Sequence, residues 1–138
     1  MARSPSLHPT ELELEILKIL WRQGEASVRQ VRDALVPFRD LAYTSVMTTL
    51  AIMHKKKTVR RRPDGKAFLY AACVGEEETS RGMLSHLIRR VFDGSAKVLL
   101  VSLLGNEDLS RSDIEELRTL IDAKALRAAK GRRKGATK

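Results

Sequence analysis

The segment that most constrains the fold runs from Leu41 to Lys57 (LAYTSVMTTLAIMHKKK) and continues directly into TVRRRPDGKAFLYA. Its first part has apolar residues at helical spacing. Its second part has two short runs on either side of a Pro-Asp-Gly turn. We therefore predict a helix followed by a β-hairpin. A helix with a cationic hairpin beside it is an arrangement that fits duplex DNA.

The two sides of this predicted helix differ in character. At about 100° per residue, Val46, Leu50 and Met53 fall on one side, which we expect to be buried. The opposite side carries small residues and hydroxyls, which let a helix approach base edges and exchange hydrogen bonds with them. An ordinary solvated surface would have the same pattern. We predict that bases are read by Thr44, Ser45, Met47 and Thr48.

The hairpin that follows is strongly cationic. Seven cations occur in the twelve residues from Lys55 to Lys66, opposed only by Asp64. Such density is easiest to explain if a polyanion neutralises it. Phe68 and Tyr70 alternate with small and apolar residues, so we expect both aromatic rings to anchor the hairpin to a core. We predict contacts with the DNA backbone for Tyr43, Lys55, Lys56, Arg60, Arg61, Arg62 and Lys66.

Charge is unevenly distributed over the 138 residues, whose formal net charge is +9. Residues 1–74 carry +6, residues 75–123 carry −4, and residues 124–138 carry +7 with no acidic side chain. A membrane surface would also attract cations, but no apolar run approaches the roughly 20 residues that span a bilayer. With no signal-like segment at the N-terminus, we expect a cytoplasmic protein without membrane insertion.

Catalytic and metal-binding patterns find no support in the sequence. His8, His54 and His86 share no ligand spacing, and no glycine-rich phosphate loop or nucleophile constellation occurs. Cys73 lies in a strand-like run, and we expect it to be a small buried residue. We predict that the protein is not an enzyme and holds no metal or cofactor.

Three helices are expected before the hairpin. Thr10 precedes Glu13, and Ser27 precedes Gln30, by the three residues of a capping box. The apolar residues after each cap recur at helical spacing. Three helices followed by a hairpin is the order of a winged helix-turn-helix, which we assign to residues 1–74. The predicted fold is therefore mainly α with a small β-hairpin.

The second half reads as three more helices, over residues 76–92, 97–104 and 110–128. They carry more apolar surface than so few residues can enclose. We predict a helical dimerisation domain over residues 75–123, although docking on the N-terminal unit is the alternative. Residues 124–138 are expected to be a disordered basic tail. The predicted dimer contacts are Leu84, Leu87, Val98, Leu99, Val101, Leu117 and Ile121.

Four strings in order resemble the BlaI/MecI family of bacterial repressors: ELEILKILW (13–21), DLAYTSVMTTL (40–50), GKAFLY (65–70) and NEDLSRSDIEELRTL (106–120). The resemblance implies a winged-helix domain, a dimerisation domain and a palindromic operator. It also implies a membrane-bound sensor metalloprotease as a partner, and relief of repression by cleavage in the dimerisation domain. The scissile region of the family corresponds here to Ser102 and Leu103.

The chain departs from the family pattern at three positions. Lys57 stands where the family usually turns on a glycine, Ile52 where an arginine is common, and Ala42 where a serine usually caps the helix. The cysteine cluster of the copper-responsive relatives does not occur, which argues against copper sensing.

Two hypotheses about function remain. The first is a dimeric, sequence-specific repressor that binds a palindromic operator. The second is a basic architectural or RNA-associated protein, in which the hairpin and the tail bind phosphate without reading sequence. The affinity for one operator relative to random duplex, at matched salt, separates them.

Overall fold

The computed structural model describes residues 8–105 and 108–136, with side chains as far as residue 131. The chain divides into two compact units, Met1–Arg90 and Val91–Lys138. As predicted, the chain is mainly helical with a small antiparallel sheet. The boundary between the units falls at the end of the fourth helix, whereas the predicted boundary after residue 74 lies just before the start of that helix, so assigning it to a dimerisation domain stays a prediction.

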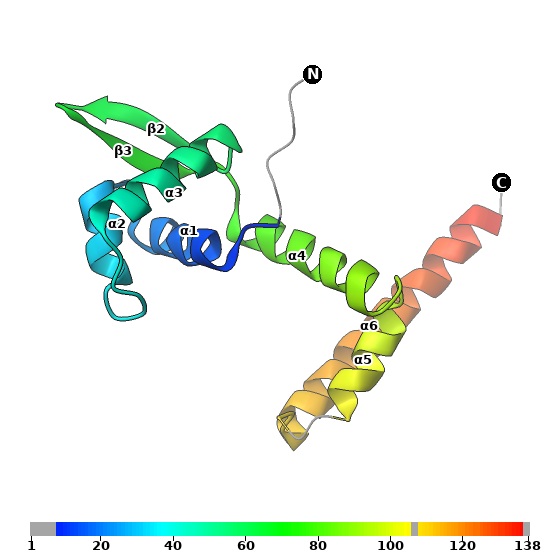
Figure 1. The fold of residues 1–138 in the computed structure, drawn as a ribbon. Coiled ribbons are helices and arrows are strands. Elements are labelled where there is room, and N and C mark those ends of the chain that lie inside the picture. The colour runs from blue at the N-terminus through cyan, green and yellow to red at the C-terminus, as the bar shows by residue number, and fades with distance from the viewer. Residues whose placement is uncertain (1–7, 106–107, 137–138) are drawn as a thin grey trace. The chain divides into compact units, whose positions relative to one another are not determined.

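The first unit has the order of a winged helix-turn-helix. Its sheet has the strand order β1-β3-β2, with both pairs antiparallel, and Figure 1 shows the β2–β3 hairpin beside α3. The two-residue strand β1 was not predicted. The elements of this unit are α1 (Glu11–Gln23), β1 (Ala26–Ser27), α2 (Val28–Leu35), α3 (Tyr43–Lys55), β2 (Val59–Asp64), β3 (Ala67–Ala72) and α4 (Glu76–Val91).

The starts of the first two helices follow from their caps. Thr10 and Glu13 form a reciprocal capping box at α1, and Ser27 and Gln30 form another at α2. Each pair satisfies two backbone donors that a helix start would leave open. At α3 the N-cap is Ala42, which makes no side-chain cap bond. The departure at Ala42 therefore leaves this helix without the usual serine contact.

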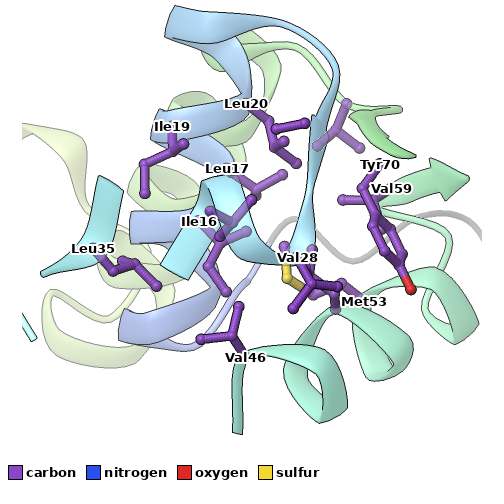
Figure 2. Close-up of a cluster of buried hydrophobic side chains, with 14 residues drawn as sticks. Ile16, Leu17, Ile19, Leu20, Val28, Leu35, Val46, Met53, Val59 and Tyr70 are labelled. Atoms are coloured by element: carbon purple, nitrogen blue, oxygen red, sulfur yellow. The ribbon is translucent and has the colours of Figure 1, made fainter. Parts of the chain in front are cut away.

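The core of the first unit joins α1, α2 and α3 to the sheet. It contains Ile16, Leu17 and Leu20 of α1 and Tyr70 of β3, which Figure 2 shows pointing inward together. The three residues predicted to be the buried side of α3, Val46, Leu50 and Met53, are each fully buried. Burial of such side chains contributes about 1.5–3 kcal/mol each, so the opposite face of α3 is held outward.

Two expectations about side chains near the β2–β3 hairpin, which we call the wing, were wrong. Tyr70 is buried as expected, but Phe68 is 38% exposed, because it lies nearer the tip of the hairpin and beyond the core. Cys73 is exposed rather than buried. It follows β3, and its backbone N–H donates to the Thr58 carbonyl at 2.8 Å while the side chain faces outward.

The second unit contains α5 (Ala96–Leu104) and α6 (Arg111–Ala136). The Ser110 hydroxyl accepts from the backbone N–H of Asp113 and caps α6. The predicted disorder of residues 124–138 is not what the structure shows, since α6 continues to Ala136. The segment is rich in Ala, Lys and Arg, which favour a helix that has already begun. Residues 106–107, inside the fourth family string, and residues 137–138 lie outside the described residues.

Candidate nucleic-acid interface

The four residues predicted to read bases lie together on one exposed face of α3. Thr44, Ser45, Met47 and Thr48 are all exposed. The loop before α3 is held in place by Arg32 of α2, whose Nε donates to the Leu41 carbonyl at 3.1 Å. The face is therefore presented by a helix that is fixed both by its buried side and by the loop that leads into it.

Ile52 extends the same face toward the C-terminal end of α3 and is 45% exposed. The family resemblance would place an arginine here, and isoleucine offers no donor to a phosphate. A branched apolar side chain can instead contact a thymine methyl group. Thr49 lies beside this face, but its hydroxyl donates to the Ser45 carbonyl at 2.8 Å and is thus already engaged.

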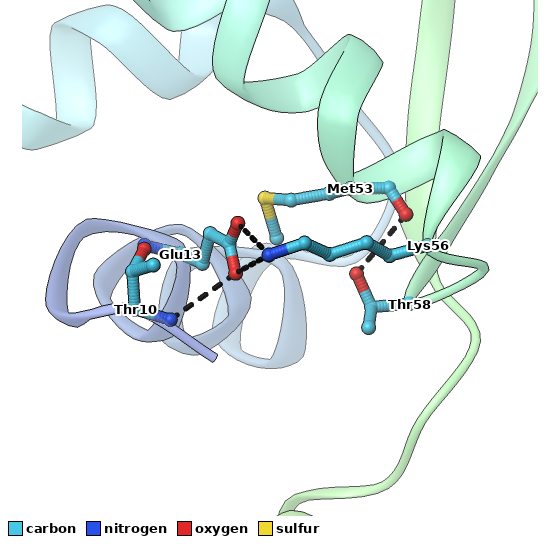
Figure 3. Close-up of polar contacts among 5 residues, drawn as sticks. All are labelled: Thr10, Glu13, Met53, Lys56 and Thr58. Atoms are coloured by element: carbon cyan, nitrogen blue, oxygen red, sulfur yellow. Dashed lines mark hydrogen bonds and ion pairs between the residues drawn. The ribbon is translucent and has the colours of Figure 1, made fainter. Parts of the chain in front are cut away.

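The junction between α3 and the wing is fixed by an ion pair between an exposed lysine and a nearly buried carboxylate. Lys56 Nζ lies 2.9 Å from Oε2 and 3.1 Å from Oε1 of Glu13, which is only 4% exposed (Figure 3). The buried Thr58 hydroxyl donates to the Met53 carbonyl at 3.2 Å. Between them, Lys57 adopts φ +70°. This left-handed conformation explains why a glycine suits the position.

A second ion pair holds the wing against the turn after α1. Arg62 of β2 makes two contacts with Glu25, at 2.8 Å from Nε and 2.7 Å from the terminal nitrogen. Hydrogen bonding to Arg62 lowers the pKa of the Glu25 carboxyl below its usual 4.5. The same contact raises the pKa of the Arg62 guanidinium. The carboxylate thus occupies the fork that Arg62 would otherwise offer to a phosphate.

Arg61 is positioned by an aromatic ring rather than by a carboxylate. Its guanidinium carbon lies 4.3 Å from the centroid of the Phe68 ring, within the range of a cation–π contact. Phe68 therefore has a role that the expected burial did not suggest. It steadies a wing cation while leaving its charge uncompensated.

The wing and its flanks nevertheless keep most of their positive charge open. Lys56 and Arg62, both predicted to touch the DNA backbone, have carboxylate partners. Among the described residues, no ion pair engages the other five cations, which are Lys55, Lys57, Arg60, Arg61 and Lys66. An exposed hydroxyl-rich helix beside these cations can contact bases and phosphates of one duplex. The pairing of these two cations with Glu13 and Glu25 was not foreseen, because the partners lie far apart in sequence.

Other chemistry is not indicated in the described part of the chain. No group of three or more histidine, cysteine or acidic side chains there is arranged to hold a metal ion. Within the same residues, no helix combines the length and the apolar character that crossing a bilayer requires.

A model of the penicillinase repressor family matches residues 9–123. The chain belongs to the penicillinase repressor family. The repressor is accordingly a DNA-binding regulator of transcription and not an enzyme. The match covers both compact units but ends within α6, thirteen residues before the end of the helix at Ala136.

Relatives of this repressor include proteins named MecI and BlaI. The methicillin resistance regulatory protein MecI of Mammaliicoccus sciuri is 29% identical over 112 residues, which are 81% of this chain and 91% of the relative. The transcriptional regulator BlaI of Mycobacterium tuberculosis is 35% identical over 105 residues, covering 75% and 76%. A solution structure of the DNA-binding domain of the repressor BlaI aligns with a TM-score of 0.49 at 22% identity, over 56% of this chain and 93% of that domain.

Proposed function

We propose that this repressor binds a palindromic operator as a homodimer, with one α3 helix in the major groove of each half-site. The wing contacts the flanking phosphates. One observation carries the proposal: the exposed face of Thr44, Ser45, Met47 and Thr48 lies on a helix whose opposite side is fully buried. Hydroxyls and a thioether on a rigid helix can contact base edges, while the wing cations supply affinity that does not depend on sequence.

The uncovered apolar surface of the second unit supports the homodimer. None of its described side chains is buried, and Val101 is 60% exposed. Exposed apolar surface of this extent marks an interaction site. Of the predicted dimer contacts, Val98, Val101 and Ile121 are exposed, whereas Leu99 and Leu117 are partly buried in the single chain.

A groove between α5 and α6 offers a place for the partner subunit. It has a volume of about 260 Å³ and an almost wholly apolar lining. A second copy would cover it symmetrically, since each copy carries both the groove and the exposed leucines beside it. The sequence prediction missed most of this lining, which consists of Leu100, Leu103, Leu104, Leu109, Leu117, Leu120, Ile121 and Lys124.

We further propose that cutting α5 near Ser102 and Leu103 relieves repression. Both residues are exposed, and α5 contains no buried side chain. When no partner covers it, a helix with so few buried contacts opens locally at low cost, and a protease needs an opened backbone. The cut would remove part of the dimer surface without touching α3. As the agent of this cleavage we propose the membrane-bound sensor metalloprotease that the resemblance to BlaI/MecI repressors implies.

Selection of bound duplexes from a random pool tests the proposal. We expect the selected sequences to be palindromic and to bind at least a thousandfold more tightly than random duplex at the same salt. Equal affinity for selected and random DNA would favour the architectural function instead. Fragments that end near Ser102, recovered from induced cells and identified by mass, would test the cleavage step.

A further inference from the structure

The C-terminal part of α6 differs sharply from the part inside the family match. Residues 124–138 contain seven basic and no acidic side chains, whereas the first part of the helix carries Asp113, Glu115, Glu116 and Asp122. The family match ends at residue 123. The helix nevertheless continues without a break to Ala136, so the basic extension is about 20 Å of helix beyond the shared region.

The face that is apolar in the first part of α6 gives way to cations in the extension. Leu117, Leu120 and Ile121 line the groove with α5, and Lys124 is the last residue of that lining. From there, Lys124, Arg127 and Lys130 follow at intervals of three residues, which places them within about 120° of the helix circumference. All three are exposed, and among the described residues none makes an ion pair with them.

The dipole of the helix does not account for this stripe of three cations, Lys124, Arg127 and Lys130. Cations are favourable near a helix C-terminus, but only within the last turn. Lys124 lies about three turns before Ala136. Like charges at neighbouring positions of a helix repel one another. The stripe therefore costs stability unless an anionic partner neutralises it.

Duplex DNA fits the stripe better than a membrane surface does. A helix that lies in a membrane interface needs a broad face of large apolar residues opposite its cations. Residues 124–138 contain only one large apolar side chain, Leu126. The protein already binds DNA, so phosphates are held at high local concentration beside any other part of the same chain.

We propose that the basic extension of α6, residues 124–136, is a second DNA-binding element that contacts phosphates without reading sequence. It adds to the contacts of the winged helix and acts on operator and random duplex alike. Its contribution is electrostatic, and so it falls as salt rises. The proposal rests on DNA binding by this family but requires neither a palindromic operator nor cleavage of α5.

The test compares two charge-matched variants of the full chain. Arg127→Gln with Lys130→Gln removes two cations from the extension, and Lys97→Gln with Arg118→Gln removes two exposed cations elsewhere in the same unit. Affinity for a selected duplex and for a random duplex is measured at several salt concentrations. We expect the first variant to flatten the slope of log affinity against log salt by up to about 1.8 per bound chain on both duplexes, since each phosphate contact contributes about 0.9.

We expect the matched control to keep the wild-type slope. Arg127→Lys with Lys130→Arg, which retains both charges, is also expected to keep it. An unchanged slope in the Gln variant, with α6 still helical by circular dichroism, would overturn the proposal. The proposal would also be overturned if the Gln variant lost affinity for vesicles containing phosphatidylserine while its affinity for both duplexes was unchanged. If the wild type itself failed to distinguish selected from random duplex, the operator proposal would fail while the slopes on random DNA still tested the extension.

Discussion

The ammonium group of Lys56 lies 2.9 Å from a carboxylate oxygen of Glu13, so the residue after α3 is tied to the first turn of α1. Glu13 also completes the capping box of α1. One carboxylate therefore links the start of the first helix to the point where the chain leaves α3 for the wing.

Replacing Lys56 should affect stability, whereas replacing its neighbour Lys55 should affect DNA binding. Lys56→Gln leaves the nearly buried Glu13 carboxylate without its cation, and we expect a loss of about 1–3 kcal/mol in the free energy of unfolding. Lys55→Gln, at an exposed position, should change stability by less than about 0.5 kcal/mol. Urea unfolding of both variants decides this. Equal unfolding midpoints would show that the ion pair contributes nothing.

Removing the Thr48 hydroxyl and methyl should weaken specific binding. Thr48→Ala is expected to lower operator affinity by about 1–3 kcal/mol per half-site and to leave binding to random duplex nearly intact. Thr119→Ala on α6 is the matched control, since its hydroxyl donates to the Glu115 carbonyl within the helix. Affinities from fluorescence anisotropy would contradict the assignment if Thr48→Ala reduced operator and random binding equally.

Freeing Arg62 from its carboxylate partner should tighten binding to all DNA. In Glu25→Gln the guanidinium loses its ionic partner, so we expect a salt slope steeper by up to about 0.9 per bound chain. Glu77→Gln, which breaks an exposed pair with Arg81, is the control and should leave the slope unchanged. The Glu25 pKa is lowered in the folded state, so the pair stabilises the fold above pH 4.5 and is lost as the pH falls through the lowered value.

Glycine at position 57 should stabilise the fold. Lys57 pays for its φ of +70°, a conformation that glycine adopts without strain. After subtracting the larger entropy of glycine in the unfolded chain, we expect Lys57→Gly to raise the free energy of unfolding by roughly 0.5–1 kcal/mol. Lys55→Gly, inside the last turn of α3, should lower it by about 1 kcal/mol. Thermal unfolding with both changes of the same sign would refute this account.

A charge at Val101 should separate the proposed dimer into single chains. Val101 is exposed in one chain, so Val101→Asp should leave the fold intact while costing several kcal/mol where a partner would bury the carboxylate. Ser112→Asp adds the same charge at an exposed position near the start of α6 and should leave association unchanged. Sedimentation at micromolar concentration is the measurement. A wild type that sediments as a monomer would end the dimer proposal.

The regular parts of the fold were predictable because they depend on nearby residues. The buried side of α3 followed from the spacing of Val46, Leu50 and Met53, and the first two helix starts followed from capping boxes. The resemblance pointed to position 57, where the structure has a left-handed residue. Local patterns could not predict ion pairs and strand pairing between residues that lie far apart in the sequence.

Three missed features share this long-range origin. The partners of Lys56 and Arg62, Glu13 and Glu25, are 43 and 37 residues away in sequence. Strand β1 has two residues and exists only because Ala26 and Ser27 pair with β3. A strand that short carries no periodic signal. The helicity of residues 124–136 was missed for a different reason, because charge density outweighed helix propensity in the prediction.

The uncovered leucines and valines of α5 bear on how long each copy of the repressor survives. A chain without a partner presents this apolar helix to the proteases and chaperones of the cell, which act on exposed apolar segments. In the proposed dimer the partner would hide the same surface. Turnover would then remove single chains faster than paired ones, so a drop in synthesis would shorten the average lifetime of the repressor as well as lower its number.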